Sequence, residues 1–297
     1  GHDQTFVSPC GEQRIVYADW TASGRLYRPI EEALLNRFGP FVGNTHSESS
    51  VTGSSMTVAY HEAHHVLKRH VNASPDDLVL TCGAGMTAAV NKLQRILGLK
   101  APEGLRRYIN VPEHERPVVF VTHLEHHSNH TSWYETIADV VVVPPDAQGV
   151  VSLVALEEQL HEYRNRPVKI GAFSACSNVT GIFTPVHEMA RLMHRAGGIA
   201  LIDYSASAPY VDVDMHPAGD PEGALDAVLF SPHKFLGGPG ASGVVIFSRA
   251  LYHNTVPDEA GGGTVAWTNP WGEYAFLDDI EAREAVQPPR VVRVQQY

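Results

Sequence analysis

The chain has 297 residues, of which 43% are hydrophobic and 19% are charged, as in an ordinary globular protein. It carries 22 basic and 33 acidic residues, a formal net charge of -11, and it has no run dense in lysine or arginine. This charge balance argues against a nucleic-acid-binding protein. The length suffices for one large domain, or for one domain with a smaller appendage.

No apolar run approaches the ~20 residues that a membrane-spanning helix needs, and the first residues lack the pattern of a signal peptide. The three cysteines, Cys10, Cys82 and Cys176, are too few for a disulfide framework. We therefore expect a cytoplasmic protein that has neither a membrane nor a nucleic acid as its partner.

The N-terminal part combines short patterns with one longer helix. Residues 14–23 are predicted to form a short strand that runs into a turn of small residues, and residues 29–38 a helix. The polar loop at 43–50 is predicted to lie on the surface or at the rim of a binding site. A helix is predicted at 55–71.

This helix contains His61-Glu62-Ala63-His64-His65, which fits the pattern H-E-x-x-H. On a helix, the spacing places His61 and His65 on one face for zinc, with Glu62 as the base. No third ligand stands at a recognised spacing, and histidine is abundant, at 17 residues. A polar helix face is therefore the preferred interpretation, a zinc hydrolase is the alternative, and no metal site is predicted.

From residue 77 onward, apolar strands alternate with helices. Strands are predicted at 77–81, 118–122, 140–143, 168–173, 199–203, 225–230 and 243–247, and helices at 88–97, from about 129, at 152–163 and at 185–196. This alternation predicts an α/β fold, a three-layer αβα sandwich with a mostly parallel sheet. Ligands of such sheets bind at the carboxyl ends of the strands, where the polar side chains are Thr87, His126, Asn178, Asp203 and Lys234.

Lys234 follows Ser231-Pro232-His233 and precedes a glycine-rich run. Its amine could form a Schiff base with an aldehyde cofactor while Ser231 and His233 bind a phosphate. A solvated lysine before a turn is the alternative.

Three further features favour the same kind of ligand. The glycine loop at 83–87 lies between a strand and a helix, where free backbone N–H groups bind anions; a bare turn is the alternative. Asp203 ends a buried strand and would pair naturally with a protonated ring nitrogen, unless it caps a turn. For the histidine cluster at 123–130, the preferred interpretation is that one imidazole stacks on a planar ring, and a metal cluster is the alternative.

Several segments between Ile15 and Glu284 occur in the order of one family's motifs. They are Tyr17-Ala18-Asp19-Trp20-Thr21-Ala22, Asn44-Thr45-His46, Gly85-Met86-Thr87, Glu125-His126-His127-Ser128-Asn129, Ser177-Asn178-Val179-Thr180-Gly181, Leu201-Ile202-Asp203, Ser231-Pro232-His233-Lys234 and Gly261-Gly262-Gly263-Thr264. The chain thereby resembles the fold-type I pyridoxal-phosphate enzymes of aminotransferase class V, in the cysteine-desulfurase-like branch.

The resemblance implies that pyridoxal 5'-phosphate is the cofactor and that Lys234 forms its Schiff base. It implies that Asp203 pairs with the ring nitrogen, that His126 stacks on the ring, and that Asn178 lies near the phenolic oxygen. Phosphate ligands would be Ser231, His233, Gly85, Met86 and Thr87, and in a homodimer Thr264 would reach the neighbouring active site. The substrate side would include Ala22, Asn44, His46 and Arg25.

The implied function is an enzyme that acts on a small amino acid, as an aminotransferase or a C–S or β-elimination lyase, with Lys234, His126 and Asp203 catalytic. The alternatives are a cysteine desulfurase, the zinc hydrolase, and a non-catalytic cofactor-binding protein. Residues 1–50 are expected to contribute to a small domain and the substrate rim. Residues 51–265 would form the large cofactor-binding domain, and 266–297 an incomplete remnant of the small domain.

Three features depart from the family pattern. No cysteine matches the mobile one that desulfuration needs, and Cys82 and Cys176 are expected to pack as small apolar residues. Ala206 stands where the family has a glutamine. The tail does not match the small domain with its carboxylate-binding arginine, for which the candidates are Arg25, Arg290 and Arg293.

Overall fold

The computed structural model describes residues 3–43, 45 and 49–285. Its centre is a seven-stranded sheet with the strand order β3-β9-β8-β7-β6-β4-β5. The strands are β3 (Asp77–Cys82), β4 (Val118–Thr122), β5 (Asp139–Val143), β6 (Lys169–Ser174), β7 (Ile199–Asp203), β8 (Ala227–Phe230) and β9 (Gly243–Ser248). From β8 to β5 all neighbours are parallel, and β9 is antiparallel to both β3 and β8. The predicted, mostly parallel sheet is confirmed.

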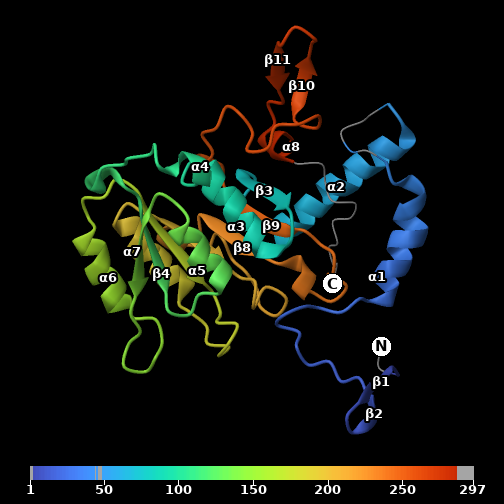
Figure 1. The fold of residues 1–297 in the computed structure, drawn as a ribbon, viewed down its shortest axis with the longest axis horizontal. Helices are drawn as coiled ribbons and strands as arrows, with labels where there is room; N and C mark the ends of the chain where they lie inside the picture. Colours follow the sequence, from blue (N-terminus) through green and yellow to red (C-terminus); the bar gives the residue numbers. More distant parts are fainter. Residues whose placement is uncertain (1–2, 44, 46–48, 286–297) are drawn as a thin grey trace.

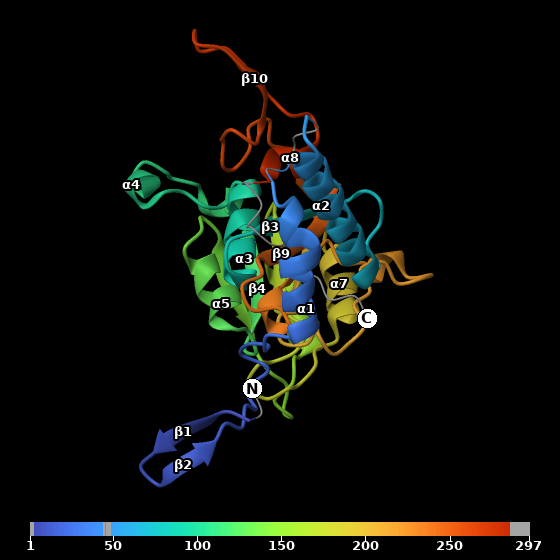
Figure 2. The same ribbon diagram turned by 90° about the vertical axis from the view of Figure 1, so that its right-hand side faces the viewer.

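Helices cover both faces of the sheet, which gives the predicted three-layer sandwich (Figure 2). One face carries α3 (Gly85–Ile96) and α5 (His127–Tyr134), and the other carries α2 (Val51–His70), α6 (Leu153–Glu162) and α7 (Val186–Arg195). Successive residues of a strand point to opposite faces, so Val119 belongs to one buried cluster and Phe120 to the other.

Two helices begin earlier than predicted, and each has a local reason. α2 begins at Val51 because Ser50 caps it, its hydroxyl oxygen accepting a hydrogen bond from the Gly53 N–H at 3.1 Å. α3 begins at Gly85, so the glycine loop that was predicted to precede this helix contains its first residue. The first turn of α3 therefore lies at the carboxyl ends of the strands.

The short strand predicted within residues 14–23 is wrong, whereas the turn of small residues that was expected to follow it is present at 20–22. β2 (Gly11–Arg14) ends where that strand was expected to begin, and residues 15–19 have no regular structure. The Tyr17 hydroxyl donates to the carbonyl oxygens of Asp19 and Ser23, both at 2.8 Å. These local hydrogen bonds fold the segment into a loop in place of the pairing that a strand requires.

Several elements lie outside the sandwich. The hairpins β1 (Thr5–Ser8)–β2 and β10 (Val265–Thr268)–β11 (Tyr274–Phe276) project from it (Figure 1), and the sequence analysis predicts neither. α1 (Arg28–Ala33) continues into a π-helical turn, close to the helix predicted at 29–38, and it contains no buried residue. Two further short α-helices are α4 (Glu103–Arg106) and α8 (Ile280–Glu284).

Glu281 of α8 ties this C-terminal helix to the sandwich. Its carboxylate accepts a hydrogen bond from the backbone N–H of Val79 at 2.9 Å and pairs with His64 at 3.3 Å and Lys68 at 3.1 Å. Burial alone would raise the pKa of Glu281, but the hydrogen bonds from His64 and Val79 and the charge of Lys68 outweigh it and lower the pKa to about 2. The folded state therefore favours the charged carboxylate.

We expect this contact to weaken in acid. A carboxyl with a depressed folded pKa stabilises the fold above its unfolded pKa of about 4.3, and this stability is lost as the pH falls towards the folded value. Glu281→Gln should cost about 3 kcal/mol at neutral pH and much less near pH 2. Urea unfolding of the wild type and of Glu281→Gln, from neutral pH down to about pH 2, measures the difference in their free energies of unfolding.

Glu62→Gln is the matched control, because Glu62 also pairs with a histidine and a cation on α2 but is 57% exposed. Exposed pairs contribute about 0–1 kcal/mol, so this variant should change little at either pH. A cost of Glu281→Gln that does not depend on pH would contradict the assignment.

Candidate active site

A cavity of about 350 Å³ lies at the carboxyl ends of the parallel strands, beside the first turn of α3. Its volume is in the range of small-molecule sites, and its position is where open α/β sheets bind ligands. It is lined by Asp19, Thr21, Ala22, Ala84, Gly85, Met86, Thr87, His126, Ser128, Ser174, Cys176, Asn178, Asp203, Ser205, Ala206, Ser231, His233 and Lys234.

Lys234 and Asp203 supply opposite charges to this cavity. Asp203 ends β7, is 5% exposed, and accepts a hydrogen bond from the Ser205 N–H at 2.8 Å, as in a turn cap. Burial raises the pKa of Asp203, while Ser205 and Lys234 act in the opposite direction. Burial lowers the pKa of the partly buried Lys234, and Asp203 opposes that shift. A buried carboxyl of this kind suits a positively charged group of a ligand.

The first turn of α3 and the segment after β8 form a candidate anion site. The N–H of Met86 donates to Ser231 Oγ at 2.8 Å. Gly85 has a φ of +63°, and a Cβ there would lie 2.6 Å from Cε1 of His233, so glycine is required for the turn and for the approach of the imidazole. The helix dipole and the hydroxyl, imidazole and N–H groups gathered here favour a phosphate.

Glu125 fixes the segment that carries His126. Its carboxylate accepts hydrogen bonds from Thr122 Oγ1 at 2.7 Å, Asn129 Nδ2 at 2.7 Å and Ser174 Oγ at 2.6 Å. These partners belong to β4, α5 and β6. His126, the cap residue of α5, is therefore held near the ends of the two neighbouring strands β4 and β6.

The structure brings most of the predicted residues together. Those that line the cavity are Lys234, Asp203, His126, Asn178, Ser231, His233, Gly85, Met86, Thr87 and Ala22. Arg25 does not line it, because its guanidinium lies over the Tyr17 ring, 4.7 Å from the centroid. Thr264 is also elsewhere: it is buried, and its hydroxyl donates to the carbonyl of Gly261 at 2.8 Å. Asn44, His46, Arg290 and Arg293 lie outside the described residues.

Sequence reasoning missed several polar residues of the cavity. Ser128, Ser174 and Ser205 lie next to predicted residues or at a strand end, and that adjacency is the signal that could have found them. The expectation that Cys176 packs as a small apolar residue is corrected, because its side chain lines the cavity just beyond β6. Burial raises the pKa of the Cys176 thiol. Cys82 does pack against a core cluster, as expected.

The H-E-x-x-H residues lie away from the cavity on an exposed face of α2. Glu62 pairs with His65 at 3.8 Å and with Arg69 at 3.5 Å, which supports the interpretation as a polar helix face. Among the residues that the structure describes, no group of three or more His, Cys, Asp and Glu side chains could hold a metal ion. No helix in this same part of the chain has the length and apolar character to span a membrane.

Comparison with known sequences gives a match over most of the chain. The family model described as "Aminotransferase class-V" matches residues 16–286. A "Probable cysteine desulfurase" of Halalkalibacterium halodurans is 29% identical over 253 residues, which are 84% of this chain and 57% of that protein. A second "Probable cysteine desulfurase", from Aeropyrum pernix, is 29% identical over 86% of this chain and 57% of its own length. The chain thus spans little more than half the length of these relatives.

Solved structures share the fold. The apo structure of the cysteine desulfurase from Thermococcus onnurineus matches with a TM-score of 0.71 and 20% identity, over 93% of this chain and 64% of that one. The cysteine desulfurase CsdA of Escherichia coli matches with a TM-score of 0.64 and 21% identity, over 92% of this chain and 64% of that one. At these identities the likeness establishes the fold, and the predicted fold class is confirmed.

Proposed function

Because the chain belongs to the class V aminotransferase family, we propose that it binds pyridoxal 5'-phosphate and acts on a small amino acid. The observation that carries the proposal is that Lys234 and Asp203 share one cavity with the first turn of α3. An amine, a buried acid and an anion site are the three groups that an aldehyde, a pyridine ring and a phosphate require.

The cavity fits this cofactor in charge and in shape. Asp203 would hold the proton of the ring nitrogen, which gives the buried carboxylate its counter-charge. Ser231, His233 and the first turn of α3 would bind the phosphate, in space that a Cβ on Gly85 would obstruct. When bound, the cofactor supplies an aldehyde that joins to amines and a ring that stabilises negative charge.

Lys234 would hold the aldehyde and, once the substrate amine has replaced it, move a proton at the α-carbon of the substrate. Burial lowers the pKa of Lys234, which enlarges the fraction of neutral amine near neutral pH. A neutral amine is both the nucleophile and the base that these two roles require. His126 and Asn178, which line the same cavity, would orient the ring.

Lys234→Ala should abolish covalent attachment of the cofactor. After addition of pyridoxal phosphate and reduction with borohydride, peptide mass mapping should find the label on Lys234, and the visible absorption band should be absent from the variant. Lys68→Ala removes a lysine on α2 outside the cavity and should keep both signals. A label spread over many lysines, or a band that survives in Lys234→Ala, would refute the proposal.

The reaction type is distinguished by products. Transfer of the amino group to a keto acid defines an aminotransferase, and release of ammonia with loss of a β-substituent defines a lyase. Cysteine desulfuration is a second candidate, favoured by the names of the relatives and by Cys176 in the cavity. A desulfurase would form alanine from cysteine in the presence of a thiol reductant. Formation of alanine should be lost in Cys176→Ser.

Three expectations stay predictions. They are the division into residues 1–50, 51–265 and 266–297, the homodimer in which Thr264 reaches a neighbouring cavity, and the cytoplasmic location. Gly261 and Gly262 of this segment are exposed and accessible to a second subunit, whereas Thr264 is buried and bonded to Gly261, so a contact through its side chain would require this segment to rearrange.

A further inference from the structure

His126 and Ser128 interact at the start of α5. His126 is the cap residue of this helix, and its Nδ1 accepts a hydrogen bond from the backbone N–H of Ser128 at 3.2 Å. Ser128 Oγ lies 3.1 Å from the same Nδ1 and 2.6 Å from Oγ1 of Thr87. All three residues line the cavity, and Ser128 stands at the variable position of the Glu-His-His-x-Asn segment.

These contacts determine which nitrogen of His126 carries the proton. A backbone N–H can only donate, so Nδ1 must be an acceptor, and a neutral imidazole then carries its proton on Nε2. Protonation of Nδ1 would place two donors against each other and break the helix cap. Burial and the nearby charges of Lys234 and His127 also lower the pKa of His126, against the effect of Asp203. The neutral Nε2–H form is therefore favoured.

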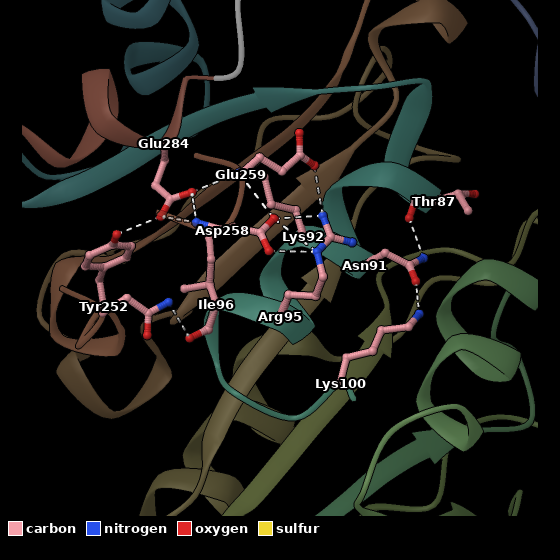
Figure 3. A network of polar contacts seen from close by, with 11 residues as sticks. Thr87, Asn91, Lys92, Arg95, Ile96, Lys100, Tyr252, Asp258, Glu259 and Glu284 are labelled. Carbon is pink, nitrogen blue, oxygen red and sulfur yellow. Dashed lines mark hydrogen bonds and ion pairs between the residues drawn. The ribbon is translucent and has the colours of Figure 1, made fainter. Parts of the chain in front are cut away.

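Thr87 anchors this arrangement to α3. Its backbone carbonyl accepts a hydrogen bond from Asn91 Nδ2 at 2.7 Å, and Asn91 Oδ1 accepts one from Lys100 (Figure 3). The Thr87 side chain meets Ser128 on the side of the cavity. The Ser128 hydroxyl thus joins the His126 ring to the first turn of α3. This turn is fixed in its place by the hydrogen bonds that Asn91 makes with Thr87 and Lys100.

We propose that Ser128 is a positioning residue for His126: its backbone N–H sets the Nε2–H tautomer of the ring, and its hydroxyl sets the ring orientation and ties the ring to Thr87. Its use in catalysis rests on the proposed function, in which His126 contacts the cofactor. The tautomer itself is a property of the free protein, so the experiment needs no cofactor.

The test is a long-range ¹H–¹⁵N correlation spectrum of the histidine rings in the cofactor-free protein during a pH titration. His126→Gln identifies the signals. The wild type should show the Nε2–H tautomer. Ser128→Ala keeps the backbone donor and should keep the Nε2–H tautomer, but it should shift the ring signals of His126, because the ring loses the hydroxyl that ties it to Thr87. Ser128→Thr keeps a hydroxyl and should restore the wild-type signals.

Thr131→Ala is the matched control, because it removes another hydroxyl of α5, one that donates to the backbone carbonyl of His127 at 2.8 Å. It should leave the His126 signals unchanged. Thr87→Val should shift them in the direction of Ser128→Ala, but by less. An Nδ1–H ring in the wild type, unchanged signals in Ser128→Ala or Thr87→Val, or an equal change in Thr131→Ala would overturn the inference. Failure to bind pyridoxal phosphate would instead count against the proposed function.

Discussion

Lys92→Met should destabilise the folded protein by about 3–5 kcal/mol, because it leaves the buried carboxylate of Glu284 without its cation. Lys92 and Glu284 have side chains that are 1% and 0% exposed, and their ion pair measures 2.9 Å (Figure 3). Glu284 also accepts hydrogen bonds from the Tyr252 hydroxyl at 2.7 Å and the Asp258 N–H at 3.1 Å. These contacts fix α8 to α3, so removal of Lys92 should loosen the C-terminal segment from the sandwich.

Lys92→Met/Glu284→Gln should recover a large part of that loss. The amide oxygen of glutamine can still accept from Tyr252 and Asp258, while the unpaired charge of Glu284 is gone. Urea unfolding of the wild type, both single variants and the double variant gives the coupling energy. Arg106→Met is the control, since its pair with Glu135 is largely exposed and should contribute about 0–1 kcal/mol. Additive costs of the two single changes would contradict a buried ion pair that stabilises the fold.

The burial of Lys92 also shows what the sequence could not predict. On the helix pattern alone, Lys92 belongs to the polar side of α3. It is buried because Asp258 and Glu284, which lie far along the chain, cover that side. No local pattern encodes such a contact. The loop at 15–19 has a different, local cause, since the hydroxyl of Tyr17 bonds the carbonyl oxygens of Asp19 and Ser23 where its apolar neighbours suggested strand pairing.

The site was more predictable than these contacts, for a topological reason. Parallel strands place their carboxyl ends at one edge of the sheet, so residues distant in sequence, such as Thr87, Asp203 and Lys234, meet once the strands are recognised. Cys176 was misjudged because it was taken to lie inside a strand end, whereas β6 ends at Ser174 and Cys176 lines the cavity two residues beyond it. The position of Arg25 depends on a loop whose backbone is hydrogen-bonded to His233 and Gly237, a contact between distant segments that no local pattern encodes.

Asp203→Asn should make the cofactor-free protein more stable and the loaded protein less active. Burial raises the pKa of Asp203, so the charged carboxylate is disfavoured in the folded state. An acid with a raised folded pKa costs stability as the pH rises above its unfolded value of about 3.9. Asparagine removes this cost and can still accept the hydrogen bond from the Ser205 N–H. The melting temperature at neutral pH should therefore rise.

The same change should reduce turnover on the order of 10²–10³-fold, as the loss of one preorganised electrostatic partner does in other active sites. It should also weaken the binding of pyridoxal phosphate, measured by absorption titration, because the ring nitrogen would lose its counter-charge. Asp226→Asn is the control: this acid immediately precedes β8, lies outside the cavity, and accepts hydrogen bonds from the Ala200 N–H at 2.7 Å and His194 at 2.8 Å. That variant should lower stability and leave the cofactor affinity unchanged. If Asp203→Asn lowered stability in the same way and bound the cofactor as tightly as the wild type, Asp203 would be a structural cap and not the partner of a ligand.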